Sequence, residues 1–529
     1  MIRRKVNAVF LSCAALSLAT ACTPVTAGQG LAVGDEAALR IDAASLPFVR
    51  EVDERFQSFQ IGMSHLTGGD TWVSYDEIPE EGVTRDYAGD LSAVREPRDP
   101  TDLTNRRLRN LASELGPFYV RYGGTTSNSV YFQDNDAPRM AEIPEGYSRL
   151  LTRAAWKGAI EFAQLVDAKI VTGFTVSSGV RDEAGVWTPV HATALLDYTE
   201  AVGGEIYAAE MFNEPNMAAY DDMLEHYGPA DFSKDFAAYS KFMKQAAPGM
   251  KLVGPGDVDV GTYAGPRPNV PETEDYFSTE PKPQFDILSY HYYGALSERC
   301  APPDSDRGVS ADDALSEEWL GRQDRPLRER KALRDKYASG APIWNTETGA
   351  AACGGPQWQP TFRDTFRYLD TNARLSKQGL DAIFTHALIS GSNGVIDEKT
   401  FRPNPNYWAA LMWRRMMGTK ILDAGPIEPG FHLYAHCQRG VSGGVTLLAI
   451  NLQDQSRGLR LNGPADLYVL SAPELQSRTV LLNGNPLKLE PDDTVPETLP
   501  RRSTSGDVTL APTSIIFIAL PDAGNASCT

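Results

Sequence analysis

Along most of the chain, short apolar runs alternate with segments in which apolar residues recur at helical spacing. Leu108, Leu111, Ala112 and Leu115 follow the i, i+3, i+4, i+7 pattern of one helix face, and Gly116 ends it. The same pattern predicts further helices at residues 159–166, 194–202, 236–243 and 407–417. Buried strands are predicted at residues 59–63, 118–122, 169–176, 206–212, 251–253, 285–290, 342–346 and 382–388.

Eight strands with room for a helix after each indicate an α/β protein built from repeated βα units. That count favours a (β/α)8 TIM barrel, which we place at residues 51–418. A doubly wound open sheet is the alternative, but no Gly-x-Gly-x-x-Gly follows the first strand.

After residue 418 the helical periodicity disappears from the sequence. Short β-rich runs follow at residues 445–452, 467–470, 479–482 and 513–520, and Asn483-Gly484 is a hairpin signal. We therefore predict a C-terminal β-sandwich at residues 419–529. Residues 36–50 are expected to add a strand to it from the N-terminal side.

The N-terminus carries a targeting pattern rather than part of the fold. Arg3, Arg4 and Lys5 precede an apolar run at residues 9–21, which is too short to span a bilayer as a helix. Residues 1–22 are interpreted as a signal peptide and residues 23–35 as a tether. The cleavage region fits both a lipobox that would lipidate Cys22 and an ordinary Ala-Thr-Ala site just before it. We therefore expect the protein to be exported. Its destination is the periplasm, the outer membrane as a lipoprotein anchored at Cys22, or the medium by secretion.

Charge and composition exclude several classes of function. The net charge is 50 − 69 = −19, so the basic footprint of a nucleic-acid-binding protein is missing. The seven histidines are scattered, with no His-Glu-x-x-His and no Cys-x-x-Cys. We therefore predict no metal, no cofactor and no nucleic-acid partner.

Four cysteines remain when Cys13 and Cys22 of the signal region are set aside. They allow three disulfide connectivities, and an exported chain favours bridges over free thiols. A Cys437–Cys528 bridge would close a loop of about 90 residues, worth roughly 4–5 kcal/mol in the chain-entropy model.

Two glutamates stand at the C-terminal ends of predicted barrel strands, where barrel enzymes carry their catalytic groups. Glu214 follows strand four in Asn-Glu-Pro-Asn, and Glu347 follows strand seven. Each motif alone is more typical of a solvated loop than of a catalytic site, but glycoside cleavage requires two carboxyl groups facing one sugar. Strands four and seven lie roughly across the barrel mouth, so the pair predicts a glycoside hydrolase. Glu210, on the same strand face as Glu214, is expected to be a buried structural carboxylate paired with an arginine.

An aromatic run ends strand six, where Tyr290, His291, Tyr292 and Tyr293 stand in succession. Such residues can form a platform for a sugar ring, and a tyrosine hydroxyl can hydrogen-bond the nucleophile. Packing in the barrel core is the alternative. We take Tyr290, His291 and Tyr293 as candidate substrate-binding residues.

In this order the motifs resemble those of the heparanase and β-glucuronidase family of retaining glycoside hydrolases. The likeness rests on residues 108–111, 119–125, 212–216, 286–293, 347–355, 397–398, 407–408, 418–420 and 434–437, and on the terminal Cys528. It covers nearly the whole mature chain.

The resemblance implies Glu214 as the acid/base and Glu347 as the nucleophile. It implies that Asn213 hydrogen-bonds the sugar 2-hydroxyl, and that Thr125 and the backbone of Gly354 border a uronic-acid subsite. The sandwich disulfide of the family would here be Cys437–Cys528. Two bridges are expected in all, among Cys300, Cys353, Cys437 and Cys528.

This chain departs from the family pattern at two positions near the expected uronate subsite. Cys353 stands where the family often has a tyrosine before the glycine pair, and Asn393 stands where a tyrosine usually helps to hold the uronate carboxylate. We keep Asn393 as a substrate-binding candidate. The excisable linker of animal heparanase is replaced by residues 133–148, so a single-chain enzyme is expected.

The sequence therefore predicts an exported retaining exo-β-glucuronidase that acts on a carbohydrate glucuronide. One alternative is an endo-acting, heparanase-like hydrolase, which needs basic residues beside the cleft to hold sulfated chains. The other is a non-catalytic carbohydrate-binding lipoprotein, against which the presence of both glutamates argues.

Overall fold

The computed structural model describes residues 38–77, 94–220, 224, 226–260, 270–301 and 307–529. The predicted signal peptide and tether, with Cys13 and Cys22, lie outside the described residues. Within the described ranges, no helix is long and apolar enough to cross a bilayer.

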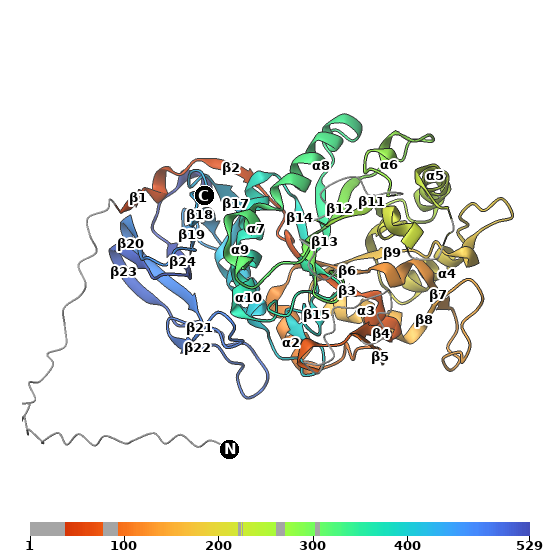
Figure 1. Ribbon diagram of the computed structural model, residues 1–529, viewed down its shortest axis with the longest axis horizontal. Helices are drawn as coiled ribbons and strands as arrows, with labels where there is room; N and C mark the ends of the chain where they lie inside the picture. Colours follow the sequence, from red (N-terminus) through yellow and green to blue (C-terminus); the bar gives the residue numbers. More distant parts are fainter. Residues whose placement is uncertain (1–37, 78–93, 221–223, 225, 261–269, 302–306) are drawn as a thin grey trace, which may run out of the picture. The chain divides into compact units, whose positions relative to one another are not determined.

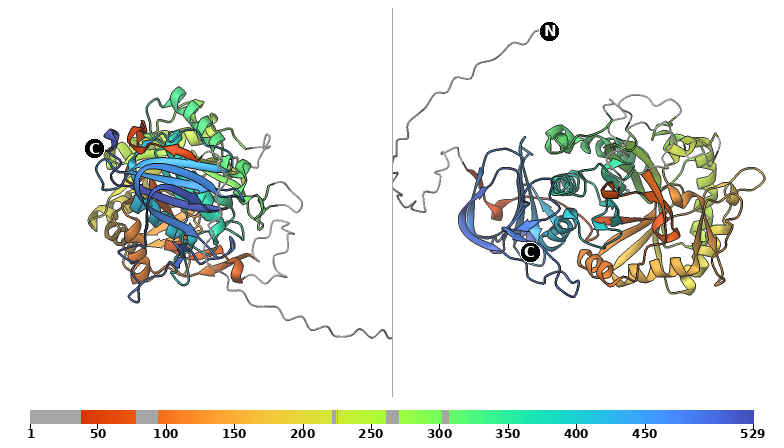
Figure 2. Two further views of the ribbon diagram at one scale, coloured as in Figure 1. Left: turned by 90° about the vertical axis from the view of Figure 1, so that its left-hand side faces the viewer. Right: turned by 60° about the horizontal axis from the view of Figure 1, so that its bottom comes forward.

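Eight parallel strands close into a barrel in the order β3-β6-β9-β10-β11-β12-β13-β14, and β14 pairs with β3 (Figures 1 and 2). They are β3 (Gln57–Gly62), β6 (Phe118–Gly123), β9 (Ala168–Gly173), β10 (Ile206–Glu210), β11 (Lys251–Val260), β12 (Ile287–Leu296), β13 (Ile343–Ala352) and β14 (Ala382–His386). Each overlaps a predicted strand, so the TIM barrel is confirmed over the open sheet. β11, β12 and β13 run further than predicted, because their extensions continue to pair with one another.

Helices follow the strands around the outside of the barrel. They are α1 (Met63–Thr67), α2 (Arg106–Leu115), α3 (Arg153–Leu165), α4 (Val190–Ala201), α5 (Pro229–Ala246), α6 (Asp275–Ser278), α7 (Glu317–Gly321), α8 (Asp324–Tyr337), α9 (Phe362–Gln378) and α10 (Pro405–Met416). Capping residues fix where several of these helices begin. The side chains of Asn105 and Thr152 accept backbone N–H hydrogen bonds at the N-termini of α2 and α3, and Pro405 occupies the first turn of α10. All five predicted helices are present.

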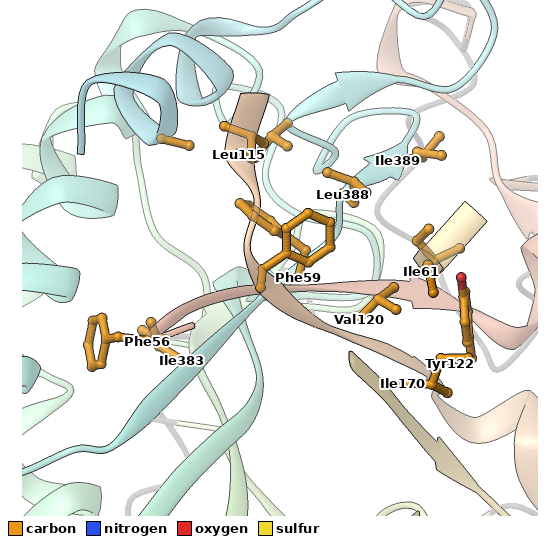
Figure 3. Close-up of a cluster of buried hydrophobic side chains, with 14 of the residues drawn as sticks. Phe56, Phe59, Ile61, Leu115, Val120, Tyr122, Ile170, Ile383, Leu388 and Ile389 are labelled. Carbon is orange, nitrogen blue, oxygen red and sulfur yellow. The ribbon is translucent and has the colours of Figure 1, made fainter. Parts of the chain in front are cut away.

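Side-chain alternation along β6 separates an outer core from the barrel interior. Phe118 and Val120 face the helices and join the main core, where the Phe118 ring meets Phe59 edge-on at 5.3 Å between centroids. Figure 3 shows part of this core, with residues of β3 and β6 beside Leu115 of α2. Tyr119 faces inward, and its ring centroid lies 4.7 Å from that of Trp344 in an apolar layer that fills the lower barrel. The next inward position on β6, Arg121, lies one level nearer the barrel mouth.

Six further strands pair in three small two-stranded sheets: β4 (Gly69–Trp72) with β5 (Arg95–Arg98), β7 (Val130–Gln133) with β8 (Arg149–Thr152), and β15 (Ile389–Ser390) with β16 (Ile396–Asp397). The other strands outside the barrel form one hydrogen-bonded sheet that folds into two layers. They are β1 (Leu39–Ile41), β2 (Phe48–Glu51), β17 (Met417–Leu422), β18 (Phe431–Gln438), β19 (Val445–Asn451), β20 (Arg457–Ser471), β21 (Leu481–Leu482), β22 (Asn485–Pro486), β23 (Arg502–Leu510) and β24 (Ser514–Leu520). The register of β20 against β23 shifts between Arg460 and Pro464, and this irregularity lets one strand serve both layers. The sandwich of the predicted fold class is thereby confirmed.

Alternate residues of the central sandwich strands face two different cores. Tyr434, Leu448 and Phe517 pack into the same core as the barrel helices. Leu447 and Ile516 face a second core, which β1 and β23 close from the other side. The segment predicted as one N-terminal strand at residues 36–50 contains two short ones: β1 pairs with β20 and β2 pairs with β17.

Local turn chemistry and disulfides hold the sandwich and the barrel mouth. Asn483 and Gly484 have φ values of 50° and 83° and join β21 to β22, so the predicted hairpin is confirmed. Cys437–Cys528 ties β18 to the C-terminus, and Cys300–Cys353 joins the segments that follow β12 and β13. Both expected bridges are thus present.

Candidate active site

The barrel interior changes from apolar to polar at the level of Arg121. This side chain is fully buried, and its guanidinium donates to four other side chains. The acceptors are Glu210 Oε2 at 2.7 and 3.0 Å, Glu347 Oε2 at 2.7 Å, Asn213 Oδ1 at 2.7 Å and Gln60 Oε1 at 2.8 Å. Glu210 is therefore the arginine-paired structural carboxylate that was expected. A guanidinium can satisfy this many acceptors because its five N–H groups form a rigid fork.

Glu214 lies in a constrained turn directly after β10. Its φ of 55° is in the left-handed region, which costs of order 1–3 kcal/mol for a residue with a side chain. The turn is held by a bond from the Glu214 N–H to the Gly256 carbonyl, at 3.1 Å. The Asn216 amide also bonds both the N–H and the carbonyl of Val258, at 3.0 and 2.9 Å. These bonds fix the direction of the Glu214 carboxyl against the strain.

Glu347 lies on β13 with both carboxylate oxygens engaged. Tyr293 of β12 donates its hydroxyl to Oε1 at 2.5 Å, and Arg121 donates to Oε2. Burial by itself would raise the pKa of Glu347, but the charges of His291, His386 and Arg121 and the Tyr293 hydrogen bond outweigh it. The pKa of Glu347 therefore lies well below its ordinary value, and the group is an anion.

Glu214 is shifted in the opposite direction. Burial raises its pKa above the ordinary value and the nearby Glu347 charge raises it further, while the hydrogen bond to His291 lowers it only in part. His291 Nδ1 lies 2.9 Å from Glu214 Oε1. Two carboxyls whose environments push their pKa values apart are the usual arrangement for one proton donor and one nucleophile.

The two carboxyl groups are close together. One ligand atom from each of Glu214, His291 and Glu347 lies within 4.8 Å of the other two. Such a group could hold a cation in principle, but Arg121 already donates to the Glu347 carboxylate, and its positive charge opposes a second cation there. The arrangement suits an anomeric carbon held between two carboxyls better than a metal ion.

The other sequence-predicted residues divide between the site and the core. Asn213 contacts Arg121, His291 contacts Glu214 and Tyr293 contacts Glu347. Tyr290 does not: its ring is fully buried in the main core, with the Arg330 guanidinium of α8 at 5.5 Å. Strand alternation explains this correction, because in β12 the side chains of His291 and Tyr293 face the barrel axis and that of Tyr290 faces the helices.

Thr125, Gly354 and Asn393 lie on three separate loops around the mouth. Thr125 is exposed just after β6. Gly354 has a φ of 76°, and a side chain there would collide with Trp72 and Arg299. Asn393 is buried and accepts a hydrogen bond from the Ser390 hydroxyl at 2.6 Å. It packs against Gly355, where a Cβ atom would lie 3.0 Å from the Cβ of Asn393.

Four residues that sequence reasoning did not single out also shape the site. Arg121 and Gln60 are polar residues in predicted strands that are otherwise largely apolar. A polar residue at such a position indicates a functional or structural role, so both could have been found from the sequence. Gln60 Nε2 has no hydrogen-bond partner among the described residues, and neither has His386 Nδ1. Arg299 offered no such signal, because its loop has no periodicity.

Similarity to known proteins extends over most of the chain, although no protein-family model matches it. Heparanase of Bos taurus is 25% identical over 500 residues, which cover 83% of this chain and 88% of that protein. Baicalin-beta-D-glucuronidase of Scutellaria baicalensis is 23% identical over 469 residues, covering 79% and 84%. Inactive heparanase-2 of Mus musculus is 22% identical over 597 residues, covering 96% and 92%.

Solved structures share the fold at lower identity. A 4-O-alpha-L-rhamnosyl-beta-D-glucuronidase from Fusarium oxysporum has a TM-score of 0.60 at 14% identity, covering 91% of this chain and all of that one. A GH51 alpha-L-arabinofuranosidase from Thermotoga petrophila has a TM-score of 0.61 at 13% identity, covering 91% and 99%. These likenesses support the barrel with its sandwich.

Proposed function

We propose that this chain, which is similar to heparanases and to a β-D-glucuronidase, is a glycoside hydrolase that releases terminal β-linked glucuronic acid with retention of configuration. The observation that carries the retaining mechanism is the short distance between the carboxyls of Glu214 and Glu347, within 4.8 Å. Retaining enzymes hold these groups about 5–5.5 Å apart, whereas inverting enzymes leave about 6.5–9.5 Å for a water molecule.

In the first step a Glu347 carboxylate oxygen attacks the anomeric carbon. The bond from that carbon to the leaving oxygen breaks, and Glu214 transfers its proton to this oxygen. The products are a glycosyl ester on Glu347 and a free alcohol. In the second step Glu214, now a carboxylate, takes a proton from water; the water oxygen attacks the anomeric carbon and displaces Glu347.

The surrounding residues suit this sequence of steps. Arg121 and Tyr293 lower the basicity of Glu347, which makes it a good leaving group when water displaces it. Asn213, held by Arg121, is proposed to hydrogen-bond the sugar 2-hydroxyl. We propose that Thr125, the Gly354 backbone and Asn393 border the uronic acid, a role supported by sequence likeness to glucuronidases.

The proposal is tested by labelling with a glucuronide-configured, mechanism-based covalent inhibitor. We expect one adduct, mapped to Glu347 by peptide mass spectrometry and lost in Glu347→Gln. Labelling only by a galactose- or xylose-configured probe would refute the uronate part while keeping the mechanism. Catalysis by Glu347→Gln at the native rate would refute the nucleophile.

The endo-acting alternative is distinguished by substrate. A sulfated heparan oligosaccharide and a chromogenic glucuronide are offered to the same enzyme preparation. We expect release of the chromogen and no internal cleavage of the oligosaccharide. The non-catalytic alternative is favoured by the similarity to inactive heparanase-2. It predicts that neither the oligosaccharide nor the chromogenic glucuronide is hydrolysed.

We also propose export, on the N-terminal targeting pattern alone. Cys22 is proposed as the lipid site of an outer-membrane lipoprotein. Intact-mass analysis of the mature protein tests this: a diacylated N-terminal Cys22 that disappears in Cys22→Ser supports the anchor. A chain beginning after residue 21 without lipid supports a periplasmic or secreted form.

A further inference from the structure

The leaving group occupies a definite side of the proposed active site. The acid must lie within hydrogen-bond reach of the oxygen that it protonates, so the leaving group lies beside Glu214. The chain around Glu214 belongs to the loop after β10 and contacts the extension of β11 through Asn216. The inference below rests on the proposed glycosidase function and concerns the chemistry of this side.

An apolar cluster separate from the main core lies on this side. Val258, Tyr293 and Leu296 form its centre, with 7%, 5% and 7% of their surface exposed. Met217, Ala301 and Ala352 pack against them and are only partly buried. We refer to these six residues as the apolar wall.

The apolar wall begins at the catalytic carboxyls themselves. Met217 donates its backbone N–H to the Glu214 carbonyl at 2.8 Å, so it lies on the acid's own turn. Tyr293 bonds Glu347 through its hydroxyl while its ring belongs to the wall. From there the wall follows β12 to Leu296, which pairs with Ala352 beside the Cys300–Cys353 bridge.

Three arginines on the same side, within the part of the chain that the structure describes, already have hydrogen-bond or ion-pair partners. Arg322 pairs with Glu318 at 2.8 Å and donates to the Gly294 carbonyl at 2.7 Å. Arg325 pairs with Asp259 at 2.9 Å. Arg299 is 1% exposed and donates to the backbone near the disulfide. A sulfated sugar would have to compete with these partners, against a net charge of −19.

We propose that the apolar wall is the leaving-group subsite and that it selects uncharged, apolar aglycones, an aromatic ring in particular, over sulfated sugar units. An aromatic leaving group removes the partly exposed apolar surface of Met217, Ala301 and Ala352 from water. A sulfate in the same place loses hydration, and the described arginines on this side, Arg299, Arg322 and Arg325, already have partners.

The test compares two aryl β-glucuronides whose leaving phenols have matched pKa values. One aryl group is uncharged and the other carries a sulfonate. We expect kcat/KM to favour the uncharged substrate at least tenfold in the native enzyme. In Leu296→Lys and in Met217→Lys the preference should fall to threefold or less, because each variant supplies a cation on the wall.

Leu165→Lys is the matched control, since it places the same cation on an exposed position at the end of α3. It should keep the native preference. A native ratio near one, or an unchanged ratio in both wall variants with native thermal stability, overturns the proposal. If Leu296→Lys does not fold, Met217→Lys, at a partly exposed position, decides alone.

The proposed function fails in a different way. Absence of hydrolysis of both aryl glucuronides, together with absence of labelling by the glucuronide-configured inhibitor, refutes the glucuronidase and not the subsite. In that case the uncharged and the sulfonated aryl groups are attached instead to the sugar whose covalent inhibitor does label Glu347. The ratio between the two leaving groups then tests the apolar wall on that sugar.

Discussion

At the residue scale, the site depends on two glutamates with the same chemistry and opposite environments. Glu347 receives hydrogen bonds from Arg121 and Tyr293, and the charges around it favour the anion. Glu214 is partly buried in a turn beside that anion, which favours the protonated form. The difference comes from neighbours contributed by other strands, because both side chains have the same intrinsic pKa of about 4.3.

The first prediction concerns Glu214 as the proton donor. Glu214→Gln should reduce kcat/KM for an alkyl glucuronide by about 10³-fold, because general acid catalysis contributes roughly 10²–10⁴-fold. For a glucuronide of a strongly acidic phenol the loss in the first step should be below tenfold, since that oxygen leaves without a proton. Steady-state kinetics with both substrates provide the measurement. Glu200→Gln, at an exposed position on α4, is the control and should match the native enzyme. Equal losses on both substrates would contradict the role.

The second prediction is a pH profile with its basic limb set by Glu214. The active form has Glu214 protonated and Glu347 ionised, so kcat/KM falls as pH rises through the raised pKa of Glu214. It falls on the acid side only when pH drops through the lowered pKa of Glu347. His291→Phe removes the hydrogen bond that lowers the pKa of Glu214, so the basic limb should move to higher pH. A basic limb that stays in place in His291→Phe would show that another group sets it.

At the element scale, one buried arginine joins four of the loops at the barrel mouth. Arg299, after β12, donates to the carbonyls of Cys353 at 3.2 Å and Gly354 at 3.0 Å, after β13. It also donates to the Val73 carbonyl at 2.5 Å, and its guanidinium carbon lies 3.8 Å from the Tyr75 ring centroid. Ser392, after β14, lies 3.4 Å from the same guanidinium. The loops around the expected uronate subsite therefore share Arg299 as a hydrogen-bonding partner.

The third prediction follows for substrate binding. Arg299→Met should raise KM for a glucuronide about tenfold, because the Gly354 loop loses the donors that orient it, while kcat changes less than threefold. Arg299→Lys should recover part of the loss, since an ammonium can still bond one or two carbonyls. Arg328→Met, on the exposed face of α8, is the control. A fall in kcat with unchanged KM would contradict a positioning role.

At the scale of the whole molecule, barrel and sandwich are joined by a buried ionic network. His432 of β18 lies 2.6 Å from Asp370 of α9, which also accepts from Tyr434 at 2.5 Å and Arg374 at 2.9 Å. Burial alone would raise the pKa of Asp370, but these donors keep it below its ordinary value. Burial would lower the pKa of His432, but Asp370 and Glu317 raise it above its ordinary value.

The fourth prediction is a pH window of stability set by this pair. Asp370 stabilises the folded state at pH values above the pKa of about 3.9 that it has in the unfolded chain. This stabilisation is lost as pH falls through the lowered pKa that Asp370 has in the folded protein. His432 stabilises the folded state fully at pH values below the pKa of about 6.5 that it has in the unfolded chain. This stabilisation is lost as pH rises through the raised pKa that His432 has in the folded protein. His432→Gln should reduce the free energy of unfolding by about 3 kcal/mol near pH 5, because a buried charge loses its partner.

Thermal denaturation across pH 4–9 measures this window. Lys157→Gln, which breaks an exposed pair with Glu161, is the control and should change the free energy of unfolding by about 0.5 kcal/mol or less. A His432→Gln effect that is equal at pH 5 and at pH 9 would mean that packing, and not the ion pair, holds the contact.

Sequence periodicity predicted all eight barrel strands and missed several sandwich strands. β18 escaped prediction because His432 and His436, polar residues, occupy buried positions on it. β23 escaped because most of its side chains are exposed and polar. A hydrophobic pattern reports burial, so it fails where buried residues are polar or where a strand is covered on one face only.

What the sequence determined by itself is local in origin. Alternation and helical spacing follow from the backbone geometry of each segment, so they predicted the barrel, the hairpin at Asn483-Gly484 and the position of Glu214 after its strand. Glu347 was expected at the end of its strand but lies within β13, because this strand continues to pair as far as Ala352. Only the tertiary structure decided which residues meet. Closure of the barrel brings Arg121 to both Glu210 and Glu347, directs Tyr293 inward and Tyr290 outward, and places Arg299 among four loops. These contacts join residues up to 226 positions apart, and no local pattern carries information over that distance.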